Sequence, residues 1–161
     1  MLGRPLSSLA NLRSFTDPEV TDLLLTVNRL KTFRGWPFDN ANGSKCTSFE
    51  LAKAGFFMTM VEESAPSAQC VCCLKDLQWE EEDIPLEEHL RKMPHCALAQ
   101  LISKKKEVDV TVGDVMRILS MREVTIAVLG QLAEDFSMIN AGMEYNQNFV
   151  DKMFRKLQNK E

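Results

Sequence analysis

Apolar residues in the last third of the chain recur at steps of three and four positions, and no proline falls between residues 112 and 158. This spacing has the 3.5-residue period of coiled-coil packing, so it predicts one long helix over residues 111–158. Thr111, followed three positions later by Asp114, is a capping pattern for its first turn. The strip predicted to pack against other helices consists of Leu129, Leu132, Phe136, Ile139, Met143, Val150, Met153 and Leu157.

This helix would be longer than a small compact domain is wide, because a domain of about 80 residues measures about 25–30 Å across. Its distal apolar strip therefore needs a covering, since soluble proteins rarely expose a large contiguous apolar surface. Two coverings are compatible with the pattern: helices of partner proteins, or the same strip of a second copy in a homodimer.

The residues before the long helix show shorter patterns separated by turn-forming residues. Helices are predicted to begin at Asp17, Thr47 and Pro85, and Gly55 ends the second. Strands are predicted at 56–61, 69–73 and 77–79. The apolar face of the first helix consists of Leu23, Leu24, Val27 and Leu30.

Four parts are predicted along the chain, because composition and periodicity change at their boundaries. Residues 1–17 form a mobile N-terminal tail, and residues 18–101 form a small domain. Residues 102–110, which contain a run of three lysines, form a linker before the helix over 111–158.

The composition is that of an ordinary folded protein, with 161 residues, 45% hydrophobic and 26% charged. The formal net charge of −4 argues against a general basic surface, so we expect no direct DNA binding. The longest nearly apolar stretch is far shorter than the ~20 residues of a membrane span, and we expect no membrane contact and no secretory leader. Five cysteines are an odd number, which favours a reducing, intracellular compartment over a disulfide framework.

Three cysteines and one histidine have the spacing of a metal site. Cys70 and Cys73 form a CxxC pair, fifteen residues separate Cys73 from His89, and six separate His89 from Cys96. Three thiolates and one imidazole make a closed tetrahedral Zn²⁺ site, which is structural because no position is left for water. We expect one zinc ion per chain.

Other assignments within this cluster stay open at the level of sequence. Cys72 could replace Cys73, although its CxC spacing to Cys70 is less favourable for a shared ion. His95 could replace His89, although it directly precedes another ligand. All five cysteines could also be buried thiols without a metal.

The residues offer little for catalysis. No glycine pattern of a phosphate-binding loop and no GxSxG motif occurs in the chain. A nucleophile pair of Cys46 and His95 stays possible, but Cys46 is expected to be a small core residue. We therefore predict a protein that is not an enzyme.

An acidic segment lies between the predicted metal ligands. Seven acids occur from Asp76 to Glu88, most of them directly after Trp79. One interpretation is a solvated acidic loop. The other is a groove in which the aromatic ring and a carboxylate bind the N-terminal ammonium and small first side chain of a peptide.

Residues 26–100 resemble the baculoviral inhibitor-of-apoptosis repeat, the BIR domain. Its opening resembles residues 29–33 and Trp36-Pro37, its middle resembles Cys46-Thr47 and residues 52–56, and its later part resembles Cys70, Cys73, Trp79, Asp83, Pro85, Glu88, His89 and Cys96. The resemblance implies an α+β fold, in which helices surround a short three-stranded antiparallel sheet and a zinc ion. A single repeat followed by one long helix is similar to the single-BIR proteins of the chromosomal passenger complex.

That resemblance implies a non-enzymatic adaptor for chromosome segregation and cytokinesis. Its BIR groove would read a histone tail phosphorylated on threonine. Its long helix would pack with helices of borealin-type and inner-centromere-protein subunits, and Aurora B kinase would be carried indirectly. The implied locations are the nucleus and centromeres, then the spindle midzone and midbody, together with the cytoplasm.

The resemblance also assigns roles in binding the histone tail. Leu77 and Trp79 would line the pocket for its first alanine, and Asp83 would hold its ammonium group. Lys75 would lie near the phosphothreonine, and Lys92 stands where the family has a histidine near the phosphate. An alternative role for Lys75 is to compensate the net −1 charge of the zinc site.

The chain departs from the family pattern at Gln78, where a glycine usually precedes the tryptophan, and the gap from Cys73 to His89 is one residue shorter. Two other functions remain compatible with the residues. One is an inhibitor of apoptosis that binds N-terminal alanine motifs or caspases. The other is a zinc-stabilised homodimer with a solvated acidic loop.

Overall fold

The computed structural model describes residues 13–60 and 66–158. Residues 1–12 of the predicted tail and Val61 of the first predicted strand lie outside the described residues. The chain divides into two compact units, Met1–Thr125 and Ile126–Glu161, with the boundary inside the long helix.

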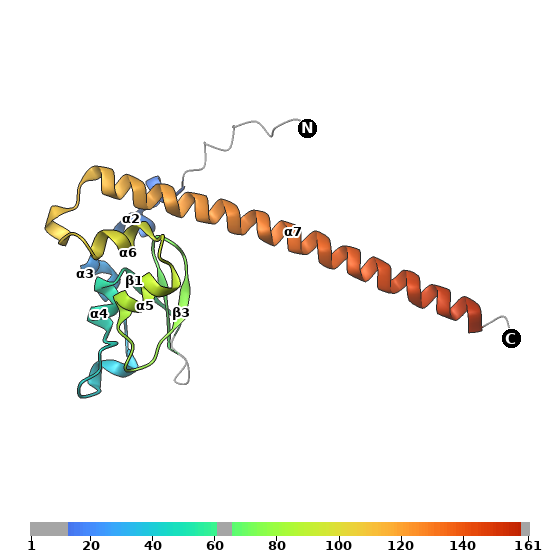
Figure 1. Cartoon of the computed structure of the whole chain (residues 1–161), viewed down its shortest axis with the longest axis horizontal. Coiled ribbons are helices and arrows are strands. Elements are labelled where there is room, and N and C mark those ends of the chain that lie inside the picture. The colour runs from blue at the N-terminus through green and yellow to red at the C-terminus, as the bar shows by residue number, and fades with distance from the viewer. Residues whose placement is uncertain (1–12, 61–65, 159–161) are drawn as a thin grey trace. The chain divides into compact units, whose positions relative to one another are not determined.

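The first unit contains the sheet and all the short helices (Figure 1). The N-terminal helices are α1 (Arg13–Thr16), α2 (Pro18–Asp22), α3 (Thr26–Leu30), the 3-10 turn η2 (Pro37–Asn40) and α4 (Ser48–Lys53). The strands are β1 (Phe56–Met60), β2 (Ser67–Cys70) and β3 (Asp76–Gln78). The remaining elements are α5 (Pro85–Lys92), α6 (Ala97–Ile102), the 3-10 turn η3 (Glu107–Asp109) and the first turns of α7 (Val112–Gln158).

The sheet is a three-stranded antiparallel meander in the order β1-β2-β3. Phe56 pairs with Cys70 at one end of the β1–β2 ladder, and Ala68 pairs with Leu77 in the β2–β3 ladder. Helices α3 and α4 pack against β1, and α5 packs against α4 and α6. The predicted α+β fold with a three-stranded sheet and a long C-terminal helix is therefore confirmed.

Aromatic side chains form the centre of the first unit. Trp36, Phe56 and Trp79 are each 3% exposed or less, and Phe33 meets Trp36 edge to face at 5.3 Å. The indole Nε1–H of Trp36 donates a hydrogen bond of 2.8 Å to the carbonyl of Cys46, so its polar atom is satisfied. Burying each such side chain stabilises the fold by about 1.5–3 kcal/mol.

A buried arginine organises the N-terminal helices. Arg29 is 2% exposed, and its guanidinium donates to the carbonyls of Leu23, Leu24 and Ala52 at 2.7–2.9 Å. Burial lowers the pKa of Arg29 to about 10, so the group stays charged at neutral pH. These bonds tie α3 to the C-terminal ends of α2 and α4.

The same bonds correct the prediction of one continuous helix from Asp17. Asp17 does cap α2, since its carboxylate accepts from the N–H of Glu19, but the helix ends at Asp22. The carbonyls of Leu23 and Leu24 turn toward Arg29 instead of continuing the helical ladder. Val27, predicted on the buried face, is 57% exposed.

Other boundaries also differ from the prediction. The second strand ends at Cys70 rather than Cys73, because residues 71–73 turn away from the ladder, and the third strand covers 76–78 rather than 77–79. Residues 13–16, predicted as part of the tail, form α1, and the N–H of Ser14 donates to the carboxylate of Glu123. A tail without helical pattern thus gains order from a distant residue.

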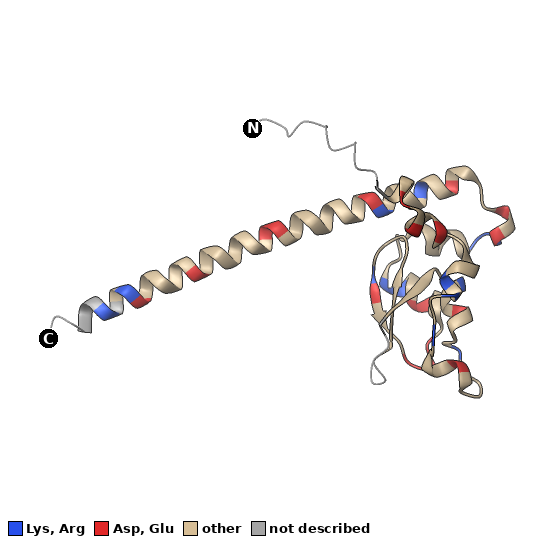
Figure 2. Cartoon of the chain, turned by 180° about the vertical axis from the view of Figure 1, so that it is seen from behind, with Lys and Arg blue, Asp and Glu red and all other residues tan. Residues whose placement is uncertain are grey.

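The second unit consists of the rest of α7, and its apolar strip is exposed. Figure 2 shows that few charged residues lie on this half of the helix. The members of the predicted strip whose side chains are described are 43–65% exposed, and the side chain of Leu157 lies outside the described ones. Within the described residues, no helix combines the length and apolar character needed to cross a membrane.

Candidate metal centre and peptide groove

The CxxC pair lies on a tight turn at the end of β2. The N–H of Leu74 donates to the carbonyl of Cys70 at 3.1 Å, and the N–H of Cys70 donates to the carbonyl of Lys75 at 3.0 Å. Leu74 has a φ of 58°, which costs a non-glycine residue about 1–2 kcal/mol. This turn places the side chains of Cys70 and Cys73 on the same side, where they can share one ligand.

Gly55 supports the turn from the neighbouring strand. Its carbonyl accepts a 3.1 Å hydrogen bond from the N–H of Val71. Its φ is 95°, and a Cβ atom at this position would lie 2.6 Å from Cδ2 of Leu98. The glycine that the sequence indicates as a helix end is therefore also required by the close approach of α6.

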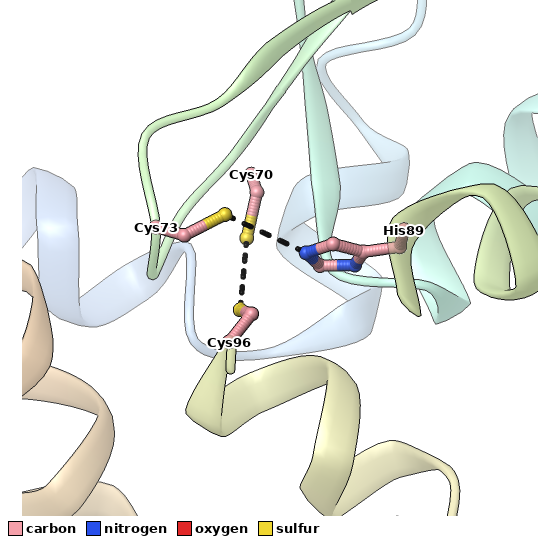
Figure 3. Close-up of side chains that lie close together, drawn as sticks. All are labelled: Cys70, Cys73, His89 and Cys96. Atoms are coloured by element: carbon pink, nitrogen blue, oxygen red, sulfur yellow. Dashed lines mark hydrogen bonds between the residues drawn. The ribbon is translucent and has the colours of Figure 1, made fainter. Parts of the chain in front are cut away.

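His89 and Cys96 complete the cluster from two helices (Figure 3). The Nδ1 atom of His89 lies 2.8 Å from the carbonyl of Ala54, so Nδ1 carries the proton and Nε2 is free to act as a ligand. Its ring also packs on Phe56, with centroids 4.6 Å apart. Cys96 is the N-cap residue of α6, which directs its thiol toward β2.

The four ligand atoms have the arrangement of a tetrahedral metal site. All lie within 4.8 Å of one another, with 3.9 Å between the Sγ atoms of Cys70 and Cys96 and 3.6 Å between Sγ of Cys73 and Nε2 of His89. A tetrahedron with metal–sulfur bonds near 2.3 Å has edges of about 3.8 Å. The residues therefore fit a metal ion, and each is 3% exposed or less.

The pKa values of the cluster residues are shifted because the buried thiols and the imidazole lie close together. Burial and hydrogen bonds to neighbouring thiols raise the pKa of Cys70, whereas hydrogen bonds from Cys70, Cys72 and Cys73 lower the pKa of Cys96. Burial opposes the charged form of His89, but hydrogen bonds to Cys73 and Cys96 outweigh it and raise its pKa to about 9. In the absence of a cation, the thiols and the imidazole compete for protons. A bound cation would end this competition, because it requires thiolates and a neutral imidazole.

The structure leaves the alternative ligands out of the four-atom group, although Cys72 lies beside Cys96. Cys72 is buried, but its Sγ lies 3.7 Å from the carbonyl of Ile118 rather than in the four-atom group, and His95 is exposed. Cys46 is fully buried, and burial raises its pKa to about 12, so its thiol carries almost no thiolate at neutral pH.

The first part of α7 packs on the same turn. Nη1 of Arg122 donates to the carbonyl of Val71 at 2.7 Å, and Ile118 belongs to the buried core. Arg122 thus brings a positive charge to the CxxC turn, where three thiolates would give a metal site a negative charge. Lys75 is exposed, so Arg122 is better placed for the compensating role that the sequence suggested for Lys75.

The residues predicted to bind a histone tail come from three segments. Lys75 lies in the β2–β3 turn, Leu77 on β3, Trp79 directly after β3, Asp83 in the following turn and Lys92 at the end of α5. Leu77 and Trp79 are two residues apart on an extended segment, so they share one face of the sheet. The role of this region as a groove stays a prediction.

The sequence suggested that the ring of Trp79 lines a groove, but the ring is buried. Its ring is 3% exposed and packs edge to face on Phe56 at 4.9 Å. Its indole Nε1 is buried and has no hydrogen-bond partner among the described residues. Asp83 accepts the N–H of Glu80 at 2.8 Å through Oδ2, which leaves Oδ1 for another partner.

Sequence reasoning missed the groups that position the ligands. The carbonyl of Ala54 orients His89, and Leu74 takes the left-handed conformation that closes the turn. Neither has a residue-type signal, because any residue supplies a carbonyl and leucine does not favour positive φ. Only the CxxC spacing and the residue types of the ligands were visible.

A family model matches the part of the chain that contains this cluster. Residues 29–100 match the family described as "BIR: Inhibitor of Apoptosis domain". A solved structure of the DIAP1 BIR1 domain bound to a Grim peptide is 35% identical, with 48% of this chain and 72% of that chain covered and a TM-score of 0.40. The sheet, the short helices and the Cys/His cluster define a single-BIR protein of the inhibitor-of-apoptosis type.

Relatives support the same assignment. Baculoviral IAP repeat-containing protein 5 of Mus musculus is 36% identical over 102 residues, which cover 63% of this chain and 70% of the relative. The proteins of the same name from Cavia porcellus and Rattus norvegicus are each 35% identical, with 63% and 65% of this chain and 69% and 72% of the relatives covered. The chain belongs to the family of Baculoviral IAP repeat-containing protein 5, also called survivin.

Proposed function

We propose that this protein is a non-enzymatic adaptor of the chromosomal passenger complex, with roles in chromosome segregation and cytokinesis. Its BIR groove reads an N-terminal histone tail phosphorylated on threonine, and its long helix scaffolds Aurora B kinase through borealin-type and inner-centromere-protein helices. The proposed locations are centromeres in the nucleus, then the spindle midzone and midbody, with a cytoplasmic pool.

The observation that carries the peptide-reading part is a half-buried apolar side chain close in sequence to a carboxylate oxygen that is left for an ammonium. Trp79 is 3% exposed, so its ring supplies the buried base of the apolar face rather than a donor that a ligand could reach. Half-buried Leu77 shares its face, and Oδ1 of Asp83 leaves a carboxylate oxygen for an ammonium. Lys75 and Lys92 are exposed and supply positive charge for a phosphate.

We propose one structural zinc ion at Cys70, Cys73, His89 and Cys96. The donor set and the 3.6–3.9 Å separations support Zn²⁺, which favours tetrahedral sulfur and nitrogen ligation. The ion supplies a rigid cross-link between β2, α5 and α6. It supplies no reaction, since all four positions are occupied by protein.

The exposed strip of α7 supports the scaffold part of the proposal. Leu129, Phe136 and Met143 are 49%, 62% and 65% exposed, a contiguous apolar surface that soluble proteins normally cover. Their 3.5-residue spacing fits helices of a mixed bundle. A homodimer through the same strip is the alternative, and the mass of the isolated chain in solution distinguishes it.

Binding of synthetic histone-tail peptides tests the reader function. Four peptides are compared, with the N-terminal amine free or acetylated and the threonine phosphorylated or not. Acetylation removes the charge that Asp83 would bind, a charge-assisted hydrogen bond of about 1.5–3 kcal/mol, so affinity should fall about 10- to 100-fold. Lys75→Ala should weaken the phosphorylated peptide selectively, whereas Lys31→Ala, at an exposed lysine directly after α3, should not.

The family description favours one alternative, an inhibitor of apoptosis that binds N-terminal alanine motifs or caspases. The same peptide set separates the two functions. Equal binding of phosphorylated and unphosphorylated tails, with tight binding of unrelated peptides that begin with alanine, would favour the alternative. Equal binding of free and acetylated tails would exclude a role for Asp83.

A further inference from the structure

The surface between α6 and the first turns of α7 contains a second groove, on elements other than those of the peptide groove. It has a volume of about 520 Å³. Ala97, Leu101 and Met121 are its apolar lining residues, called here its floor, and Lys104, Lys105 and Arg117 supply its cations. All of these residues belong to the first unit. We call it the α6–α7 groove.

The positive charge of this groove is not neutralised by its single acid, Asp114. The Oδ2 atom of Asp114 accepts from Nζ of Lys105 at 2.8 Å and from the N–H and hydroxyl of Thr111 at 2.9 and 2.7 Å. This carboxylate is thus committed to Lys105 and to the cap of α7. Among the described residues, Lys104 and Arg117 form no ion pair, so two cations face the groove uncompensated.

The floor is shaped for an apolar side chain. Met121 is half-buried, and its sulfur accepts the N–H of Ala97 at 3.2 Å, which fixes it across the start of α6. Leu101 is also half-buried beside it. A methionine and a leucine make an adaptable surface that a small inorganic anion would leave uncovered.

The groove is positive although the chain as a whole carries a net negative charge. The net charge is −4, and the acidic segment 80–83 lies on a different part of the first unit. Figure 2 shows basic and acidic residues in the segment that follows α6 and again in the first turns of α7, and of these acids only Asp114 lines the groove. A local positive groove on an acidic protein attracts a short acidic segment, whereas a long polyanion such as DNA would also meet the repulsive acidic surface.

We propose that the α6–α7 groove binds an acidic peptide segment of a partner protein, with one apolar side chain on Leu101 and Met121 and carboxylates against Lys104 and Arg117. The site is independent of the proposed peptide groove. It needs no free N-terminus, because no carboxylate in the α6–α7 groove is available for an ammonium.

The test uses the full zinc-loaded chain and an N-acetylated, C-terminally labelled probe peptide, Glu-Asp-Leu-Glu-Asp-Glu. Acetylation keeps this probe out of a groove that requires a free amine. Amide chemical shifts should change within residues 95–121, and fluorescence anisotropy should give the affinity. Lys104→Gln combined with Arg117→Gln should weaken binding about tenfold, since it removes two ion pairs.

A matched variant removes the same charges elsewhere. Lys31→Gln combined with Arg34→Gln takes one exposed lysine and one exposed arginine from the first unit and should leave the affinity unchanged. Replacing the leucine of the probe by glycine should also weaken binding. The proposal is overturned if the shifts fall within residues 75–92, if both double variants weaken binding equally, or if duplex DNA or inorganic phosphate displaces the probe at similar charge concentration.

Discussion

Each residue of the candidate metal cluster is positioned by a different local backbone conformation or hydrogen bond. Cys70 ends a strand, Cys73 follows a turn closed by Leu74 in the left-handed region, and Cys96 is an N-cap residue. His89 is turned by a hydrogen bond to a backbone carbonyl. Four unrelated local conformations converge on one point, so the loss of a single ligand leaves the other three buried without a common partner.

At this scale we expect Cys73→Ser to abolish stoichiometric zinc and to unfold the domain. A structural zinc ion contributes on the order of 10 kcal/mol, more than the net stability of most small domains. Metal content by atomic absorption and folding by circular dichroism check this. Cys72→Ser is the control, since Sγ of Cys72 lies outside the four-atom group and the metal should remain. Full zinc in Cys73→Ser would show that the ligand assignment is wrong.

Among the elements, α7 has the clearest division of roles. Its first turn is capped by the reciprocal bonds between Thr111 and Asp114 that the sequence predicted. Its next turns pack Ile118 into the core and place Arg122 on the CxxC turn. Beyond residue 126 nearly every described side chain is exposed. This half of the helix therefore adds little to the packing of the chain, and a role for it would lie in assembly.

The cap of α7 should weaken in acid. The hydrogen bond from Lys105, together with those from Thr111, holds the pKa of Asp114 well below its usual range. A lowered folded-state pKa contributes stability above the unfolded value near 3.8, and this stability is lost as pH falls toward the folded value. An NMR titration of the Asp114 side chain should show ionisation persisting below pH 3.8. Lys105→Gln should shift that midpoint upward, and an unshifted midpoint in the variant would contradict the stated cause.

A charge in the strip of α7 should prevent assembly without affecting the first unit. Leu132→Glu or Ile139→Glu should abolish co-purification with borealin-type and inner-centromere-protein helices, because an unpaired carboxylate would be buried in the bundle. Zinc content and histone-peptide binding should stay unchanged. Ala141→Glu, an exposed position off the strip in the same helix, is the control. Normal assembly of Leu132→Glu would mean that the strip is not the interface.

The whole molecule contains a domain with a candidate metal site and a long helix, and we expect them to respond differently to metal removal. Both tryptophans are buried in the first unit, so their emission reports on that unit alone. A zinc chelator should shift this emission to the red and unfold the sheet, and added zinc should restore it. Unchanged tryptophan emission in a chain shown to be zinc-free would mean that the metal does not hold the domain together.

Local and periodic features of this protein could be predicted from the sequence. The long helix, the cap at Thr111 and the CxxC spacing each depend on residues a few positions apart, so residue type alone encodes them. The strand positions were predicted to within a few residues for the same reason.

Only the tertiary structure decided where distant segments meet. The break between α2 and α3 follows from Arg29 reaching the carbonyls of Leu23 and Leu24, and the ordering of residues 13–16 accompanies a bond to Glu123. The carbonyl that orients His89 and the convergence of cations beside Arg117 arise from contacts across the fold. Backbone groups carry no residue signature, and surface charges combine into a site only where the folded chain places them side by side.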